Sequence, residues 1–304
     1  MPIATARANR EVVSFDDLPV PEFTGLREVA PDIRTLREMI DWRFFFIAWE
    51  LKGTYPAILD EPVARELYDE VQALLDRIQA GKLLRARGVY GFWPAHSEGD
   101  DIVLDHGVRF PMLRQQRLDS KPARCLADYV APEGDHLGAF AVSIQGAEEL
   151  AAEYEAQQDD YHAIMVKSIA DRLAEAFAEW VHLKARREWY EPDADPNLDD
   201  LHHERFRGIR PAFGYPASPD HSLKGAGFDL LDAGSVGMRL TENFAMTPAA
   251  SVSALLFAHP GARYFAVGRI GEDQVRDYAQ RLGVPVADAE RLLRPNLGYE
   301  PKER

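Results

Sequence analysis

The stretch from Gly208 to His221 constrains the fold most, because it places three prolines and two glycines around one arginine and one tyrosine. A proline follows both Arg210 and Tyr215 and disfavours helical backbone at each, so both side chains are held on extended backbone. Gly214 lacks a Cβ, which lets a ligand or another strand come close to the chain. The stretch is therefore predicted to be a stiff loop.

The side chains of this loop favour a particular kind of ligand. An arginine offers a planar fork that binds a carboxylate through two hydrogen bonds, and a tyrosine offers a flat face and one hydroxyl. A small zwitterion with a flat group suits that pair. The alternative is a turn-rich connection whose arginine pairs with a carboxylate of the protein itself.

The composition disfavours several classes of protein. A formal net charge of −15 opposes the phosphate attraction on which nucleic-acid binding depends, and equally an anionic membrane surface. Cys125 is the only cysteine, which excludes an intramolecular disulfide and any multi-cysteine metal site. The start of the chain has no apolar signal core, and the longest aromatic-aliphatic run, residues 44–49, is too short to span a bilayer. We expect a globular cytoplasmic protein with no nucleic-acid or membrane partner.

The pattern along the chain indicates a lead-in segment followed by one domain. Residues 1–30 carry scattered prolines and charges without a clear period and are predicted to be a lead-in or linker, which leaves residues 31–304 as the domain. Apolar residues at helical spacing predict the helices. These cover residues 32–40, 61–82, 159–189, 272–282 and 286–293, with a shorter helix-like stretch at 228–233.

The long predicted helix at 159–189 carries Asp171, Glu175 and Glu179 in a row on the face opposite its apolar stripe. Like charges aligned in this way repel by roughly a few tenths of a kcal/mol per pair. The ordinary interpretation of such a row is a solvent-exposed face.

Between the helices, the period changes to that of strands separated by glycines and polar turns, which suits antiparallel pairing. Alternation in the last predicted strand sends Tyr264 and Phe265 to opposite faces, so at least one of them could reach a ligand bound against the sheet. The predicted strands cover residues 88–93, 102–104, 108–113, 137–144, 252–258 and 263–269.

Common catalytic and nucleotide-binding motifs are absent from the sequence. It contains no glycine-rich phosphate loop, GxGxxG fingerprint, HExxH, CxxC or GxSxG elbow. His202 and His203 are adjacent and would point apart on a regular element, which makes them weak metal candidates. His96 and His106 lie near polar turns and are expected at the surface. We expect neither a catalytic residue nor a bound metal.

The loop sequence RPAxGYPxxPxH resembles the S-adenosylmethionine-binding motif in the activation domain of cobalamin-dependent methionine synthase. Other segments are similar to that family in the same order, so the resemblance spans nearly the whole chain from about residue 30. It implies an α+β fold, a C-shaped single domain with a bent antiparallel β-sheet flanked by helices. The similar segments are residues 40–42, 87–89, 92–95, 125–132, 138–142, 159–161, 164–167, 170–179, 240–242, 250–253 and 296–299.

The resemblance also implies a binding site for S-adenosylmethionine. Arg210 would bind the carboxylate of the ligand and Asp41 its ammonium group, although the sequence alone favours a helix-end role for Asp41. A tyrosine is common in the family where this chain has Phe265, so a side-chain hydrogen bond from that position is in question. The implied cofactor-binding residues are Asp41, Arg210, Ala212, Gly214, Tyr215, Tyr264 and Phe265, with Glu204 as a further acidic candidate.

A partner domain is implied as well. The family residues that match Asp171 and Glu175 face the cobalamin-binding domain and can hydrogen-bond the histidine released from cobalt, whose protonated form the carboxylates favour. That domain, in the same or a separate chain, would hold the cobalamin. The resemblance thus identifies the chain as a reactivation module of methionine synthase, which supports reductive methylation of cob(II)alamin with an electron from a flavodoxin or a flavoprotein reductase.

Two other functions stay open on the sequence alone. One is a stand-alone protein that binds or senses S-adenosylmethionine without a cobalamin partner. The other is a complete small-molecule methyltransferase. The acidic pair Asp171 and Glu175 favours a docking partner over both.

Overall fold

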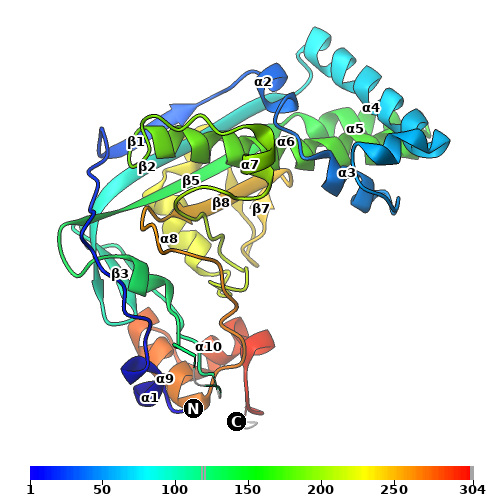
Figure 1. Ribbon diagram of the computed structural model, residues 1–304. Helices are drawn as coiled ribbons and strands as arrows, with labels where there is room; N and C mark the ends of the chain where they lie inside the picture. The colour runs from blue at the N-terminus through cyan, green and yellow to red at the C-terminus, as the bar shows by residue number, and fades with distance from the viewer. Residues whose placement is uncertain (118, 120, 302–304) are drawn as a thin grey trace.

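The computed structural model describes residues 1–117, 119 and 121–301, and within them six strands form one antiparallel sheet of order β4–β3–β2–β5–β8, with β1 also paired to β2. The central strand β2 pairs with β5 over residues 85–95. Its other neighbour is β1 over residues 88–92 and β3 over residues 95–98, and the sheet curves along this strand (Figure 1). The strands are β1 (Gly25–Val29), β2 (Arg85–Glu98), β3 (Asp101–Leu104), β4 (Arg109–Pro111), β5 (Asp135–Gln145) and β8 (Ser251–Leu256).

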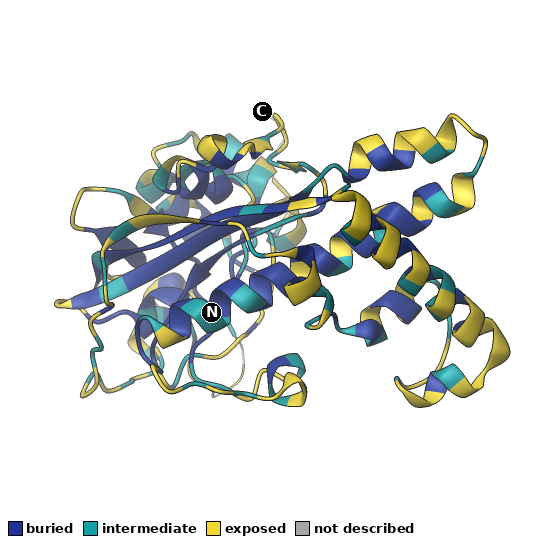
Figure 2. Ribbon diagram, turned by 90° about the horizontal axis from the view of Figure 1, so that it is seen from above, coloured by how far each residue is buried: buried dark blue, intermediate teal, exposed yellow. Residues whose placement is uncertain are grey.

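Successive side chains of β2 and β5 point to opposite faces of the sheet, and a buried core lies against each face. Phe92 and Phe140 belong to one core, and Trp93 and Ala139 belong to the other. The first core lies against α6 (Asp160–Arg187), and Figure 2 shows the strands buried while the outer helices expose one side. The remaining helices are α1 (Ile3–Ala8), α2 (Ile33–Arg37), α3 (Trp42–Ala48), α4 (Pro62–Gly81), α5 (Ala147–Glu155), α7 (Leu198–His202), α8 (Leu223–Leu230), α9 (Glu272–Leu282) and α10 (Val286–Leu292).

The curved sheet joins two helical groups into a C-shape. Helices α3, α4 and α5 lie at one end, and α1, α9 and α10 lie at the other (Figure 1). A short pair, β6 (Arg239–Leu240) and β7 (Met246–Thr247), lies beside β8. This arrangement confirms the α+β fold with a bent antiparallel sheet.

Most of the predicted elements are present, but the structure departs from the predictions in several places. Residues 263–269 form no strand. They follow an irregular path in which the Val267 amide donates to the Pro216 carbonyl at 2.8 Å, and Gly268 has a φ of +73°. The sequence did not predict α1 and β1, which are too short to show a period. The helix expected at 228–233 is α8, which begins earlier, at Leu223.

Residues 1–30 therefore contain two ordered elements. Ile3 and Ala6 of α1 pack against Ala123, and the Ile3 amide donates to Asp273 of α9 at 2.6 Å. Strand β1 pairs with β2. The boundary at residue 30 stays a prediction.

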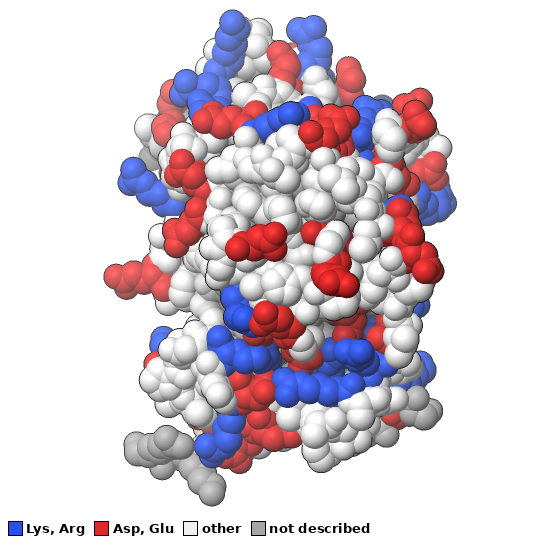
Figure 3. Space-filling model, turned by 90° about the vertical axis from the view of Figure 1, so that its left-hand side faces the viewer, with Lys and Arg blue, Asp and Glu red and all other residues white. Residues whose placement is uncertain are grey.

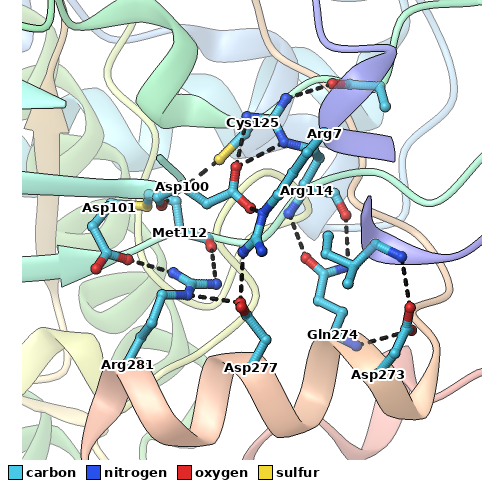
Figure 4. Close-up of polar contacts among 12 residues, drawn as sticks. Arg7, Asp100, Asp101, Met112, Arg114, Cys125, Asp273, Gln274, Asp277 and Arg281 are labelled. Atoms are coloured by element: carbon cyan, nitrogen blue, oxygen red, sulfur yellow. Dashed lines mark hydrogen bonds and ion pairs between the residues drawn. The ribbon is translucent and has the colours of Figure 1, made fainter. Parts of the chain in front are cut away.

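A buried ion-pair network holds the end of the sheet to α1 and α9 (Figure 4). Arg114 is 1% exposed and contacts both Asp100 and Asp128 at 2.6 Å. Arg7 joins Asp100 to Asp277 at 2.7 Å each. Further along α9, Arg281 pairs with Asp277 and with Asp101, and Gln274 exchanges hydrogen bonds with the backbone of Arg114. We call these residues the Arg114 network.

The surface carries charges of both signs despite the acidic total. On the face shown in Figure 3 much of the centre is uncharged, and side chains of both signs lie toward both ends. None of the helices in the described part of the chain is both long and apolar enough to cross a membrane.

Candidate functional site

The loop at 208–221 is extended and held against β8, as its prolines predict. Ile209 exchanges two backbone hydrogen bonds with Phe257, at 3.2 and 3.0 Å, and the Leu255 amide donates to the Pro211 carbonyl at 3.2 Å. A tight turn follows, closed by a 2.7 Å hydrogen bond from the Gly214 amide to the Ser218 carbonyl. These contacts fix the backbone on both sides of Arg210.

Gly214 serves the turn itself. Its φ of +88° is rarely adopted by residues with a Cβ, and a Cβ built there would lie 2.0 Å from a carbon of the His221 ring. The close neighbour at Gly214 is therefore the imidazole of His221. Gly214 is not among the described residues that line the cavities discussed below.

Arg210 points from this loop toward α6. Its side chain is 16% exposed and pairs with Glu179 at 2.8 Å between Nη2 and Oε2. Its Nη1 lies 3.2 Å from Nδ1 of His182, and its backbone amide donates to the Tyr264 hydroxyl at 3.0 Å. Arg210 therefore pairs with a carboxylate of the protein, as the alternative interpretation of the loop predicted. It also lines two cavities, so it remains within reach of a ligand.

His182 holds the second side of the Arg210 guanidinium. Burial lowers its pKa well below the usual value, and the charges of Arg210 and Arg186 lower it further. The ring is therefore neutral, and because Nδ1 faces the donor Arg210, the proton belongs on Nε2, 3.1 Å from the Tyr190 hydroxyl. A neutral acceptor here orients Arg210 without adding a second positive charge.

Glu179 is the carboxylate of the α6 row whose exposure the sequence analysis predicted wrongly. Asp171 and Glu175 are exposed, as expected of a solvated row, but Glu179 is only 6% exposed and faces Arg210. Burial raises the pKa of its carboxyl group, although the Arg210 guanidinium acts in the opposite direction. The proline-rich loop covers this end of α6 and buries Glu179, the third carboxylate of the row.

Two adjoining cavities meet at Arg210 and share Glu175, Glu204 and Arg210 in their walls. The first, of about 600 Å³, is lined mainly by charged and histidine residues, and we call it the polar cavity. The second, of about 620 Å³, has a more apolar wall. The polar cavity is also lined by Met39, Asp41, Phe44, Arg172, Ala176, Glu179, Leu201, His202 and His203. The apolar cavity is also lined by Phe140, Pro211, Ala212, Phe213, Tyr215, Pro216, Ala217, Lys224, Met246, Ser251, Val252, Ser253, Ala254, Tyr264 and Phe265.

Asp41 lies in the polar cavity and caps α3. Its carboxylate accepts the Arg43 amide at 3.0 Å and the Arg43 guanidinium at 2.6 to 3.1 Å. Burial opposes ionisation of Asp41, but the hydrogen bonds from Arg43 outweigh it and lower the pKa. Asp41 also borders a third cavity of about 910 Å³ on the side of Tyr55 and Tyr68, which no residue of the 208–221 loop lines.

The apolar cavity brings together the remaining predicted residues of the loop and of the segment after β8. Tyr264 is 43% exposed and its hydroxyl is fixed by the Arg210 amide, whereas Phe265 is buried in the second core. Tyr215 is exposed at the cavity mouth. Tyr264 and Phe265 thus differ in exposure, but both line this cavity, and their segment is not a strand.

The acidic candidates differ in position. Glu204, in the left-handed region with φ +51°, and Glu175 line both cavities. Asp171 lies one turn of α6 before Glu175 and is not among the described residues lining either one. Lys224, which the sequence analysis missed, is a buried cation in the apolar cavity, where Nζ lies 2.9 Å from Nδ1 of His221 and 3.1 Å from the Phe244 carbonyl.

Comparison with known proteins agrees with this fold. The family model described as "Vitamin B12 dependent methionine synthase, activation domain" matches residues 32–283. A crystal structure of the MetH reactivation domain bound to AdoHcy is 44% identical in sequence and superimposes with a TM-score of 0.95. The match covers 98% of this chain and 99% of that one.

Proposed function

The chain belongs to the family of vitamin B12-dependent methionine synthase activation domains, and from this we propose that it binds S-adenosylmethionine at Arg210 and presents its methyl group to a cobalamin carried by another domain. The observation that carries the proposal is the meeting of a polar and an apolar cavity at one arginine. Their volumes lie in the range of small-molecule sites, about 300–1,000 Å³ each. S-adenosylmethionine has matching halves, a charged amino acid and a flat nucleoside.

The charges of the polar cavity suit this ligand. Its wall contains four carboxylates, against the two guanidinium groups of Arg172 and Arg210. The ligand carries a sulfonium and an ammonium group, so an acidic wall favours it, while its one carboxylate is matched by Arg210. We assign the ammonium group to the side of the cavity that holds Asp41, and the adenosyl part to the apolar cavity, shaped by Ala212 and Tyr215 beside Tyr264 and Phe265. AdoHcy, which the related MetH domain binds, has the same amino acid and nucleoside.

The role of the chain in the reaction is positioning. The reduced cobalt of cobalamin, on the partner domain, supplies the nucleophile when it is bound there. This chain would fix the two ends of the methyl donor, so that a bimolecular transfer becomes an effectively unimolecular one. We propose that the exposed carboxylates of Asp171 and Glu175 face that partner and hydrogen-bond its released histidine. A flavodoxin or a flavoprotein reductase would supply the electron, in a reducing cytoplasm that suits the buried, unpaired thiol of Cys125.

Calorimetric titration of S-adenosylmethionine into the wild-type chain and Arg210→Ala tests the pocket. We expect saturable binding that weakens in the variant by about 1.5–3 kcal/mol, the usual contribution of a charge-assisted hydrogen bond. Arg276→Ala is the matched control, because Arg276 is an exposed arginine of α9 paired with Glu272. Equal affinity of wild type and Arg210→Ala would refute the assignment of Arg210.

A second measurement separates the proposed role from its rivals. Mixed with a cobalamin-loaded partner domain, the chain should form a complex that weakens when Asp171 and Glu175 are replaced together by Asn and Gln. Ligand binding without any such complex would indicate a stand-alone sensor. Methyl transfer to a small molecule in the absence of cobalamin would indicate a complete methyltransferase.

A further inference from the structure

Residues 9–22 connect α1 to β1 without forming a helix or a strand, and Figure 1 shows this dark blue segment leading from one end of the C-shape to the sheet. Backbone hydrogen bonds fix both of its ends. The Asn9 carbonyl accepts the Ala123 amide at 2.8 Å, and the Glu22 amide donates to the Glu188 carbonyl at 2.8 Å. We call residues 9–22 the strap. Because the strap belongs to no helix or sheet, its position depends on the side-chain contacts that it makes between these ends.

The first of these contacts lies beside Tyr264. The Glu11 carboxylate, 12% exposed, accepts hydrogen bonds from the Arg263 guanidinium at 2.6 Å and the Arg124 guanidinium at 2.7 Å. It also accepts the Tyr129 hydroxyl at 3.1 Å. Arg263 directly precedes Tyr264 in the chain. One buried carboxylate of the strap therefore joins the Tyr264 segment to two other parts of the molecule.

The second contact is made by the imidazole of His259, in the turn between β8 and Tyr264. Its Nδ1 accepts the Gly261 amide at 2.9 Å, so the ring proton belongs on Nε2, which donates to the Ser14 carbonyl at 2.9 Å. The Phe15 ring meets the same imidazole edge-on, with 5.2 Å between the ring centroids. His259 thus fixes the shape of its own turn and ties that turn to the strap.

The third contact lies beside Arg210. Arg207, three residues earlier in the chain, is 18% exposed and donates from Nη1 to the Asp17 carboxylate at 2.5 Å. Its Nε donates to the Ala258 carbonyl at 2.6 Å. The two segments held in this way meet where the Arg210 amide donates to the Tyr264 hydroxyl. The strap therefore holds both of the segments that present these two residues to the cavities.

We propose that the strap positions Arg210 and Tyr264, so that affinity for the ligand depends on the strap being docked on Arg207, His259 and Arg263. The inference rests on the proposed function, because it takes the ligand to be S-adenosylmethionine. A ligand that binds the docked state better stabilises docking by the same free energy. Anything that pulls the strap away therefore releases the ligand, which gives the site a means of regulation outside its own cavities.

Chymotrypsin digestion of the wild-type chain tests this linkage without any variant. Cleavage after Phe15 requires its ring to leave His259, so the rate reports how often the strap is undocked. Saturating S-adenosylmethionine should slow this cleavage by about fivefold or more, the low end of usual coupling between sites. A free peptide of residues 9–22 should be cleaved at the same rate with and without the ligand. Mass spectrometry identifies the product.

Two strap variants test the same coupling from the other side. Phe15→Ala, which changes no charge, and the double variant Glu11→Gln/Asp17→Asn should each weaken binding of S-adenosylmethionine by about fivefold or more. Calorimetry measures the affinity at a temperature where circular dichroism shows every variant folded. The matched control is Glu22→Gln/Glu28→Gln, which removes two charges at exposed positions and should stay within about twofold of wild type.

The inference and the proposed function fail in different ways. Strap variants that unfold at lower temperature but bind as tightly as wild type would give the strap a structural role only and overturn the inference. An equal loss of affinity in the control would assign the effect to net charge and also overturn it, as would cleavage after Phe15 that the ligand does not slow. A wild type that does not bind S-adenosylmethionine would overturn the proposed function itself.

Discussion

The Arg114 network and the Arg210 site are built from the same parts but differ in completeness. Each places an arginine against a buried carboxylate, Asp100 and Asp128 at Arg114 and Glu179 at Arg210. Arg114 uses its guanidinium fully, on Asp100, Asp128 and the Ala123 carbonyl, at 2.6–2.7 Å. Around Arg210, the Glu179 carboxylate keeps an oxygen without a partner among the described residues, and a cavity adjoins the guanidinium.

The difference separates a structural cluster from a binding site. A closed network holds helices to the sheet and has no place for a further charge. An incomplete network contains polar groups without a partner, which a ligand can hydrogen-bond. Four changes test this distinction, from the largest expected effect to the smallest.

Arg114→Leu should break the closed network. The substitution leaves the carboxylates of Asp100 and Asp128 buried with less compensation, so the free energy of unfolding should fall by about 3–5 kcal/mol. Urea denaturation followed by circular dichroism measures this loss. Arg276→Leu, at an exposed pair, should stay within about 0.5 kcal/mol of wild type. A loss below about 1 kcal/mol for Arg114→Leu would show that the network contributes little to the fold.

Gly214→Ala should distort the backbone of the incomplete site. The left-handed φ and the clash with the His221 ring together predict a loss of about 2–4 kcal/mol in stability, and ligand affinity should fall with it. Gly225→Ala on α8 is the matched control, because a Cβ there meets nothing within 4 Å and alanine suits a helix. Equal stability of the two variants would contradict the constraint at Gly214.

His182 should make the stability of the Arg210 site depend on pH. The pKa of His182 is lower in the folded state than in the unfolded state. The stability that the neutral ring contributes is therefore fully present above the unfolded pKa of about 6.5, and it is lost as the pH falls below that value. The slope is about 1.4 kcal/mol per pH unit. Glu179, whose pKa is raised, acts in the opposite sense, as its contribution is lost when the pH rises through its folded value.

The His182→Asn variant isolates the histidine, because the asparagine oxygen can replace Nδ1 as an acceptor from Arg210. Unfolding free energies measured from pH 7.5 to 5 should fall more steeply for wild type than for this variant, by about 2 kcal/mol over the range. Parallel curves would mean that His182 does not titrate with unfolding.

Tyr264→Phe should have the smallest effect. It removes the hydroxyl that accepts the Arg210 amide at 3.0 Å, in a side chain that is 43% exposed, so water can take its place. We expect ligand affinity to fall by about 0.5–1 kcal/mol. Calorimetry measures it, and a loss above about 2 kcal/mol would give the hydroxyl a direct part in ligand binding.

The sequence predicted the parts of the site that depend on local chemistry. Prolines next to Arg210 and Tyr215 were enough to predict an extended loop, and apolar periods predicted α4, α6, α9 and α10. The strand predicted at 263–269 was wrong because apolar alternation does not reveal whether a partner strand exists. Residue roles within the site stay predictions.

Glu179 shows why the rest of the site could not be predicted. Positions four apart on a helix are rotated by about 40° relative to each other, so a row that spans eight residues turns by about 80°. Asp171 therefore faces solvent while Glu179 faces the loop that crosses α6. Only the packing of residues 208–213 against β8, set by contacts distant in sequence, decides that this carboxylate is buried.

The pairing of Ile209 and Pro211 with β8 has one more consequence. β8 is the last strand of the sheet, and an open edge of this kind offers unpaired amides and carbonyls to other chains. The backbone of Ile209 and Pro211 occupies part of that edge. The segment that presents Arg210 also protects the protein against edge-to-edge aggregation, so a chain that lost this segment would lose solubility as well as its ligand.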